Sequence, residues 1–410
     1  MACVDCSATT PWRAPVKRSL DTRAMVRAIV VFLVAAVAVT WLLSAQSTAA
    51  TTESAGFSGV VAANTATETT TIGAPALMNG DVPSSTSTPV PSEVDTPEQT
   101  AVSESQSRVL QNVFNGVVFG LLLALASVGL SLIYGTTGLS NFAHGEQVSL
   151  GAMLAYFFAT DQPVGLPLTP WHFVIGWPLW LAALAAIVLA GASGWIQDRF
   201  LWGKLRKRGV GKVQQMIVSI GLSLALLNFL QWWIGPDRLR LSKTIEVKHQ
   251  VGPIQVGDIT IMSIGIAAVA LIGVAVFLQR TRLGRATRAV SDNPSLAAAS
   301  GIQVNSIIRL VWIMAVSLAA LGGILLALYD NGTKFDVGAK LLLLMFAAVT
   351  LGGLGQPYGA LVGSLVIGVV VETSTLWLGP DLKYATALGI LIIVLLVRPQ
   401  GLLGRVERVG

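Results

Sequence analysis

The chain has 410 residues, of which 53% are hydrophobic and only 12% are charged. A soluble domain carries about a quarter charged residues, so this composition excludes an ordinary soluble domain and indicates an all-α polytopic membrane protein. The formal net charge of +6 comes from basic residues between apolar runs. It therefore points to orientation in a membrane and not to nucleic-acid binding.

The N-terminal region differs in composition from the rest of the chain. Residues 1–43 join a basic stretch to an apolar run, which predicts a signal peptide or an uncleaved anchor. Cys3 and Cys6 form a CxxC with no Cys or His at ligand spacing, so no zinc site is expected. Residues 44–107 are rich in Ser, Thr, Ala and Pro and contain no Lys or Arg, which predicts a disordered extracytoplasmic linker.

Residues 108–404 are the predicted membrane domain, and residues 405–410 are a predicted cytoplasmic tail. Uncharged runs there approach the roughly 20 residues that a helix needs to cross a bilayer. We predict about nine membrane segments, at residues 112–134, 145–160, 172–195, 214–234, 258–278, 306–329, 340–354, 359–378 and 384–397.

The distribution of Lys and Arg orients these segments. The loops 196–213 and 279–305 are basic, whereas the loop 161–171 has no basic residue. Counting crossings from outside at residue 108 places both basic loops in the cytoplasm, as the positive-inside rule requires. The loop 235–257 falls outside despite its basic residues, and its alternation in TIEVKHQVGPIQVG is typical of β-structure.

Two of the predicted segments, 145–160 and 340–354, are short and bounded by glycine-rich sequence. Each follows a long span, 112–134 or 306–329, and these two spans start on opposite sides of the membrane. The membrane domain is therefore predicted to consist of two inverted halves. Short, glycine-interrupted segments at matching positions indicate a transporter's substrate path, although a pair of helical hairpins with tight turns would give the same pattern.

Polar residues next to the apolar runs are candidates for that path, because intramembrane polar groups face a bundle interior or a wet cavity. These candidates are Asn141, His144, Glu146, Gln147, Glu372 and Thr373. For His144 and Glu146 the alternative is an interfacial helix cap. For Glu372 it is a carboxylate hydrogen-bonded to neighbouring helices.

The polar stretch 280–302 is expected to present a small capped helix to the cytoplasm. Asp292 or Asn293 can cap its N-terminus, Pro294 suits its first turn, and Gly301 suits the position after its end. Four arginines precede it, so the helix is placed to touch a cytosolic partner. The alternative is a basic topogenic loop with an incidental helical turn.

No catalytic arrangement is apparent in the sequence. It has no nucleophile elbow, no HExxH and no Walker A loop. We therefore expect no enzymatic activity, no metal and no cofactor, and any ATP that drives transport must bind a separate subunit.

Several stretches resemble a known family. GLSNFAHGEQVSLGAMLA (138–155), GRATRAVSDNPSLAAASGI (284–302), LGGLGQPYGALVGSLVIGVVVE (351–372) and RPQGLLG (398–404) are similar to the permeases of branched-chain amino acid ABC importers. The resemblance covers roughly residues 108–404. It implies a prokaryotic cytoplasmic-membrane protein that works with a second homologous permease, cytosolic ATPase subunits and an extracytoplasmic binding protein.

In that family the loop corresponding to 284–302 is where the ATPase docks. Its matching residues here are Arg285, Arg288, Asp292, Asn293, Leu296 and Gly301. Urea and short-amide permeases share most of these motifs, so that substrate class is an alternative. An ion-coupled secondary transporter, with Glu146 or Glu372 carrying the proton, is another.

Overall fold

The computed structural model describes residues 97–165, 172–241, 247–379, 382–397 and 401–403. The predicted N-terminal signal or anchor, most of the linker and the C-terminal tail lie outside the described residues. Six described helices are long and apolar enough to cross a membrane: Ser107–Thr137, Leu179–Lys207, Lys212–Ile234, Asp258–Arg280, Val304–Tyr329 and Pro357–Ser374. The structure is thus that of an all-α polytopic membrane protein, with a helix at each of the nine predicted segments.

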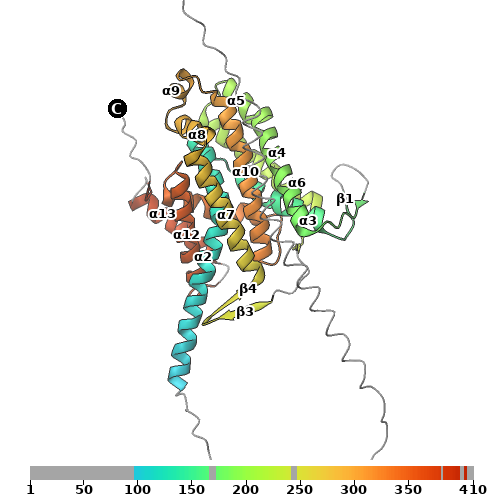
Figure 1. The fold of residues 1–410 in the computed structure, drawn as a ribbon, viewed down its shortest axis with the longest axis vertical. Helices are drawn as coiled ribbons and strands as arrows, with labels where there is room; N and C mark the ends of the chain where they lie inside the picture. Colours follow the sequence, from blue (N-terminus) through green and yellow to red (C-terminus); the bar gives the residue numbers. More distant parts are fainter. Residues whose placement is uncertain (1–96, 166–171, 242–246, 380–381, 398–400, 404–410) are drawn as a thin grey trace, which may run out of the picture.

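The first half begins with the long helix α2 (Pro97–Thr137), which projects beyond the rest of the bundle at its N-terminal end (Figure 1). Because this helix begins at Pro97, the predicted domain boundary near residue 108 falls inside it. The remaining elements of this half are α3 (His144–Ala159), β1 (Val164–Gly165), β2 (His172–Phe173), α4 (Leu179–Gln197), the π-helical turn η1 (Asp198–Trp202), α5 (Gly203–Lys207) and α6 (Lys212–Ile234).

A connecting region joins the halves and consists of β3 (Lys248–Val251), β4 (Ile254–Gly257), α7 (Asp258–Arg280), α8 (Arg282–Asp292) and α9 (Pro294–Ala299). The second half consists of α10 (Val304–Tyr329), α11 (Val337–Gly352), α12 (Pro357–Ser374) and α13 (Lys383–Val397). β3 and β4 pair antiparallel, which confirms the β-structure predicted in the loop 235–257.

Helix packing shows the predicted inverted repeat. The contact of α2 with α12 in the structure corresponds to the contact of α10 with α4. In the same way, α3 contacts α4 and α6, and its counterpart α11 contacts α12 and α13. A Cβ on Gly129 of α2 would lie 2.7 Å from the carbonyl oxygen of Ala315, and one on Gly322 of α10 would lie 3.3 Å from that of Leu122. Gly322 follows Gly129 in the sequence by the same number of positions as Ala315 follows Leu122. The two halves therefore use equivalent positions to bring α2 and α10 together.

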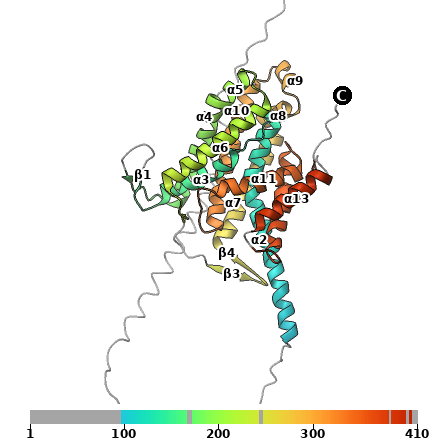
Figure 2. The ribbon, with the colours of Figure 1, turned by 180° about the vertical axis from the view of Figure 1, so that it is seen from behind.

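The ends of the bundle carry different elements. α5, α8 and α9 lie together at one end, and the β3–β4 hairpin lies at the other (Figures 1 and 2). We call these the α9 end and the hairpin end. The two basic loops predicted to share a side thus lie at the same end.

The predicted segment 172–195 is displaced in the structure. Its first residues form β2 and an irregular stretch in which Gly176 has φ 58°, and α4 starts only after Pro178. Proline fixes its own φ and lacks an N–H, so it favours helix starts and not interiors. After α4 the chain remains helical through η1 and α5, which occupy part of the loop that was predicted to follow this span.

Candidate substrate path and coupling segment

α3 and α11 both begin near the middle of the bundle. His144, at the start of α3, has its Nε2 3.0 Å from the carbonyl oxygen of Ala126, which lies well inside α2. The first turn of α11 reaches the same level, because the Gly338 amide donates to Ser149 Oγ of α3 at 2.8 Å. From this level the two helices run to opposite ends: α3 reaches Trp233 at the end of α6, and α11 ends beside residues 402 and 403.

Gly145 and Gly338 allow these half-length helices to cross in direct backbone contact. A Cβ on Gly145 would collide with the Gly338 carbonyl and lie 2.9 Å from Leu342 Cβ, and a Cβ on Gly338 would collide with the Gly145 carbonyl. The contact is reciprocal, as expected where the axis of an inverted repeat passes. We call it the crossing. Discontinuous helices that start at this depth form the binding sites of many secondary transporters.

Four predicted path residues, Asn141, His144, Glu146 and Gln147, lie together at the start of α3 and are fully buried. His144 Nδ1 is 2.9 Å from Gln147 Oε1, and Gln147 Nε2 donates to Gln197 Oε1 at 2.8 Å. His144 and Gln147 thus fix α3 against α2 and α4, which agrees with a packing role.

Glu146 and Asn141 have polar atoms without a partner. Ser223 of α6 donates to Glu146 Oε1 at 3.4 Å, whereas Glu146 Oε2 and Asn141 Nδ2 have none. Unpaired buried polar groups are costly, so these two atoms are candidates for contact with water or with a bound molecule. The carboxylate also lies in the first turn of α3, where a helix N-terminus favours negative charge.

Asp336 and Lys340, at the start of α11, were given no role by the sequence analysis. Lys340 Nζ lies 2.7 Å from Asp336 Oδ2, and the lysine side chain is 51% exposed. Sequence alone could have revealed them, because Lys340 opens one of the two short segments. Their depth in the bundle, set by the crossing, could not be read from the sequence.

Glu372 and Thr373 do not join this cluster. They lie near the C-terminal end of α12, where the backbone carbonyl of Glu372 accepts hydrogen bonds from Asn112 Nδ2 and Thr375 Oγ1. The predicted path residues therefore form two groups, one at the crossing and one nearer the hairpin end. Among the described residues, no group of His, Cys, Asp and Glu could hold a metal ion.

The coupling segment forms two short helices at the α9 end. Asn293 caps α9, its Oδ1 accepting from the Leu296 amide at 2.9 Å, and Asp292 is the last residue of α8, which decides between the two predicted caps. Pro294 lies in the first turn of α9, and Gly301 follows its end with φ 84°, both as predicted. Leu296 is 65% exposed, which leaves an apolar side chain on the tip of this segment.

The helix α8 was not predicted from the sequence. This helix has Gly284, Thr287 and Val290 on its buried side, so Arg282, Arg285 and Arg288 point outward. Thr281 Oγ1 caps its start by accepting from the Gly284 amide at 2.9 Å. Its polar face is wide, which is why the stretch resembled a basic loop.

Bundle, inverted repeat and opposed half-helices together define a polytopic membrane permease. The model of the family described as the branched-chain amino acid transport system permease component matches residues 112–395. The chain belongs to this family.

Individual relatives agree. The high-affinity branched-chain amino acid permease LivH of Salmonella typhimurium LT2 is 31% identical over 312 residues, covering 75% of this chain and 99% of that protein. LivH of Escherichia coli K12 shows 31% identity over 313 residues with the same coverage. BraD of Pseudomonas aeruginosa PAO1 shows 32% over 309 residues, covering 73% and 96%. No solved structure matches the chain.

Proposed function

We propose that the chain is the permease subunit of an ATP-driven importer of branched-chain amino acids. The observation that carries this proposal is the exposed, capped helix α9 on a chain of this family. An exposed apolar residue on a helix tip beside outward arginines suits contact with a protein partner. ATP and its hydrolysis belong to that partner, and the permease itself needs no cofactor.

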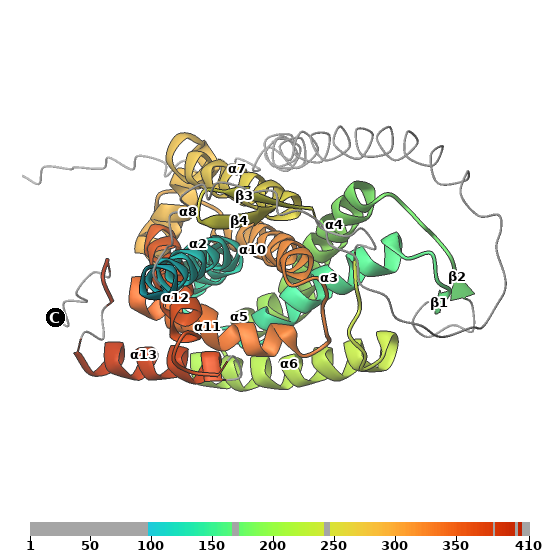
Figure 3. The same cartoon turned by 90° about the horizontal axis from the view of Figure 1, so that it is seen from below.

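We place the second permease subunit on the face formed by α6, α11 and α13. α11 packs against α13, and α6 runs along the same edge of the bundle as α13 (Figure 3). Leu224 of α6 is 58% exposed, Ile393 of α13 is 61% exposed, and the Lys340 side chain of α11 is 51% exposed. A lysine facing lipid near the bilayer centre costs roughly 2.5–3.5 kcal/mol, so this face is better covered by protein or by a wet path.

Transport then proceeds by alternating access. A binding protein delivers the amino acid at the hairpin end, and closure of the ATPase dimer moves α9. The two inverted halves rock about the crossing, and the substrate passes close to Glu146, Lys340 and Asp336. The localisation that follows is a prokaryotic cytoplasmic membrane, with the α9 end inside.

Uptake of radiolabelled leucine into proteoliposomes tests this function. The two permeases, the ATPase subunits and the binding protein of the proposed transporter are reconstituted together. We expect uptake that requires both internal ATP and the binding protein. Glu146→Gln should retain most of it, because the energy source lies in another subunit.

An ion-coupled carrier predicts different results. Uptake that needs no ATPase, and that collapses in Glu146→Gln or with a protonophore at constant ATP, would exclude the importer. Valine, isoleucine, urea and acetamide as competitors identify the substrate class. Competition by the amides and not by the amino acids would assign the chain to amide transport.

A further inference from the structure

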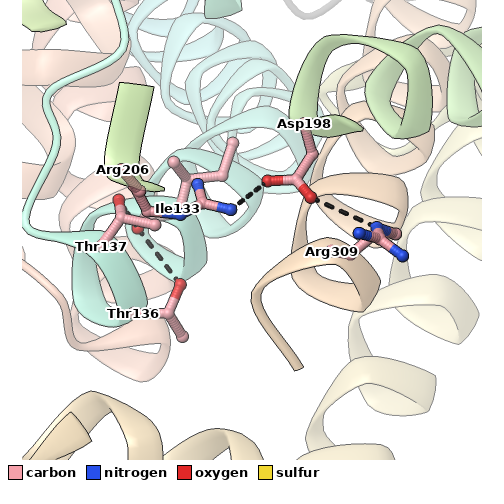
Figure 4. A network of polar contacts seen from close by, with 6 residues as sticks. All are labelled: Ile133, Thr136, Thr137, Asp198, Arg206 and Arg309. Atoms are coloured by element: carbon pink, nitrogen blue, oxygen red, sulfur yellow. Dashed lines mark hydrogen bonds and ion pairs between the residues drawn. The ribbon is translucent and has the colours of Figure 1, made fainter. Parts of the chain in front are cut away.

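Asp198 is a buried carboxylate between two arginines from different halves of the bundle. Its side chain is only 1% exposed. Arg206 Nη2 of α5 donates to its Oδ1 at 2.5 Å, and Arg309 Nε of α10 lies 3.4 Å from its Oδ2 (Figure 4). A buried ion needs such partners, since leaving it uncompensated costs several kcal/mol. The two contacts are unequal, so the one to Arg309 is the weaker.

The π-helical turn η1, where Asp198 lies, is also fixed to α10 by two indoles. Trp202 and Trp312 stack with ring centroids 5.4 Å apart and an interplanar angle of 16°, and both are fully buried. A π-turn within an α-helix is rare and is often found at functional sites. Arg309 lies in the second turn of α10, shortly after α9 ends. Arg309 is therefore close to α9 along the chain, with only the loop 300–303 between the two helices.

From η1 a chain of hydrogen bonds continues to the crossing. Gln197, the neighbour of Asp198, accepts from Gln147 of α3, and Gln147 in turn contacts His144. His144 lies against the Ala126 carbonyl of α2. Each of these side chains is buried or half-buried, so water competes little for the contacts. The start of α3 is thereby tied to the same turn as Asp198.

We propose that Asp198 is a positioning residue that transmits movement of the α9 end to the start of α3, through Arg309 on one side and Gln197 on the other. It touches no substrate. Arg206 stays bound to the carboxylate in both conformations of the alternating-access cycle. The longer contact between Asp198 and Arg309 breaks and forms again during transport. This role rests on the proposed ATP-driven import.

The complete transporter in proteoliposomes, with leucine as the substrate, tests the proposal by giving uptake and ATP hydrolysis together. Arg309→Gln leaves Asp198 bonded to Arg206, so the permease should fold. Leucine imported per ATP should fall at least about fivefold. Asp198→Asn should cause a similar loss, and the double variant should be no worse, because all three lack the same contact. Arg309→Lys should restore part of the ratio.

Arg199→Gln is the matched control. Arg199 belongs to the same turn and is exposed, with its guanidinium 5.6 Å from the Trp195 ring centre. This variant should keep the wild-type ratio of leucine to ATP. A destabilised permease would lose uptake and hydrolysis together, so the ratio separates coupling from folding.

Hydrogen exchange of the permease at residues 138–147 gives a readout that needs no substrate. Arg309→Gln should raise exchange there, and Arg199→Gln should not. If the wild type hydrolyses ATP but imports no leucine, the proposed function fails and the exchange result alone decides the role of Asp198. An unchanged leucine-to-ATP ratio in a working importer, or unchanged exchange, overturns the proposal.

Discussion

At the residue scale, the two glycines of the crossing set the depth at which both half-helices begin. Glycine costs helix stability, yet here only a hydrogen in place of a side chain lets the two backbones touch. As a result, the carboxylates of Glu146 on α3 and Asp336 beside α11 lie at the same depth in the bundle. Small residues at helix contacts are typical of membrane proteins, where packing replaces the hydrophobic effect.

Gly145→Ala and Gly338→Ala should each destabilise the permease by about 1–3 kcal/mol, since the new methyl group meets a carbonyl oxygen of the facing helix. Gly265→Ala is the control, because this glycine of α7 is exposed with no neighbour within 4 Å of a Cβ. It should be neutral or slightly stabilising, since alanine favours helix. The melting temperature in detergent measures the difference. Equal melting of all three variants would show that the crossing is not tight.

At the element scale, composition and periodicity were sufficient to locate the membrane segments, and glycine placement was sufficient to predict the inverted halves. The same patterns gave wrong element boundaries where a proline or a narrow apolar helix face decides the local structure. Residues 173–177 carry mostly apolar side chains but precede Pro178, so they lie in β2 and in the irregular stretch after it and not in a helix. Residues 282–292 are basic but form α8, because three small or apolar residues on one side are enough to bury it.

The arrangement of the candidate path residues could be predicted only in part, and for a physical reason. A sequence shows which polar residues border a span, as it did for Glu146, but not how deep a half-helix begins. Lys340 therefore went unnoticed, and Glu372 was grouped with residues that lie on other elements. The caps of α9 were predictable, because Asn293, Pro294 and Gly301 act within one short stretch of backbone.

The exposed tip of α9 leads to a prediction about ATPase binding. Leu296→Asp places a charge at the apolar contact and should abolish copurification of the ATPase subunits with the permease, together with uptake. The helix itself should persist, since its cap is unchanged. Val251→Asp is the control, because Val251 is 62% exposed on the hairpin at the opposite end. Normal copurification with Leu296→Asp would remove α9 from the interface.

At the scale of the whole molecule, both basic loops lie at the α9 end and the β3–β4 hairpin lies at the other end. This shared sidedness is what the charge pattern predicted, but a helix bundle by itself does not reveal which end is cytoplasmic. The positive-inside rule assigns the α9 end to the cytoplasm. All proposals that involve an ATPase depend on this orientation, because ATP is supplied on that side.

Single cysteines test the orientation in intact cells, after Cys3 and Cys6 are replaced by serine. Gln250→Cys lies on β3, whose side chains are all exposed, and Ser295→Cys lies on the exposed surface of α9. A membrane-impermeant maleimide should label Gln250→Cys directly and Ser295→Cys only after permeabilisation. Ser85→Cys, in the predicted linker, should behave like Gln250→Cys. Labelling of Ser295→Cys in intact cells would place α9 outside, where no ATPase could reach it, and would refute the importer together with its coupling segment.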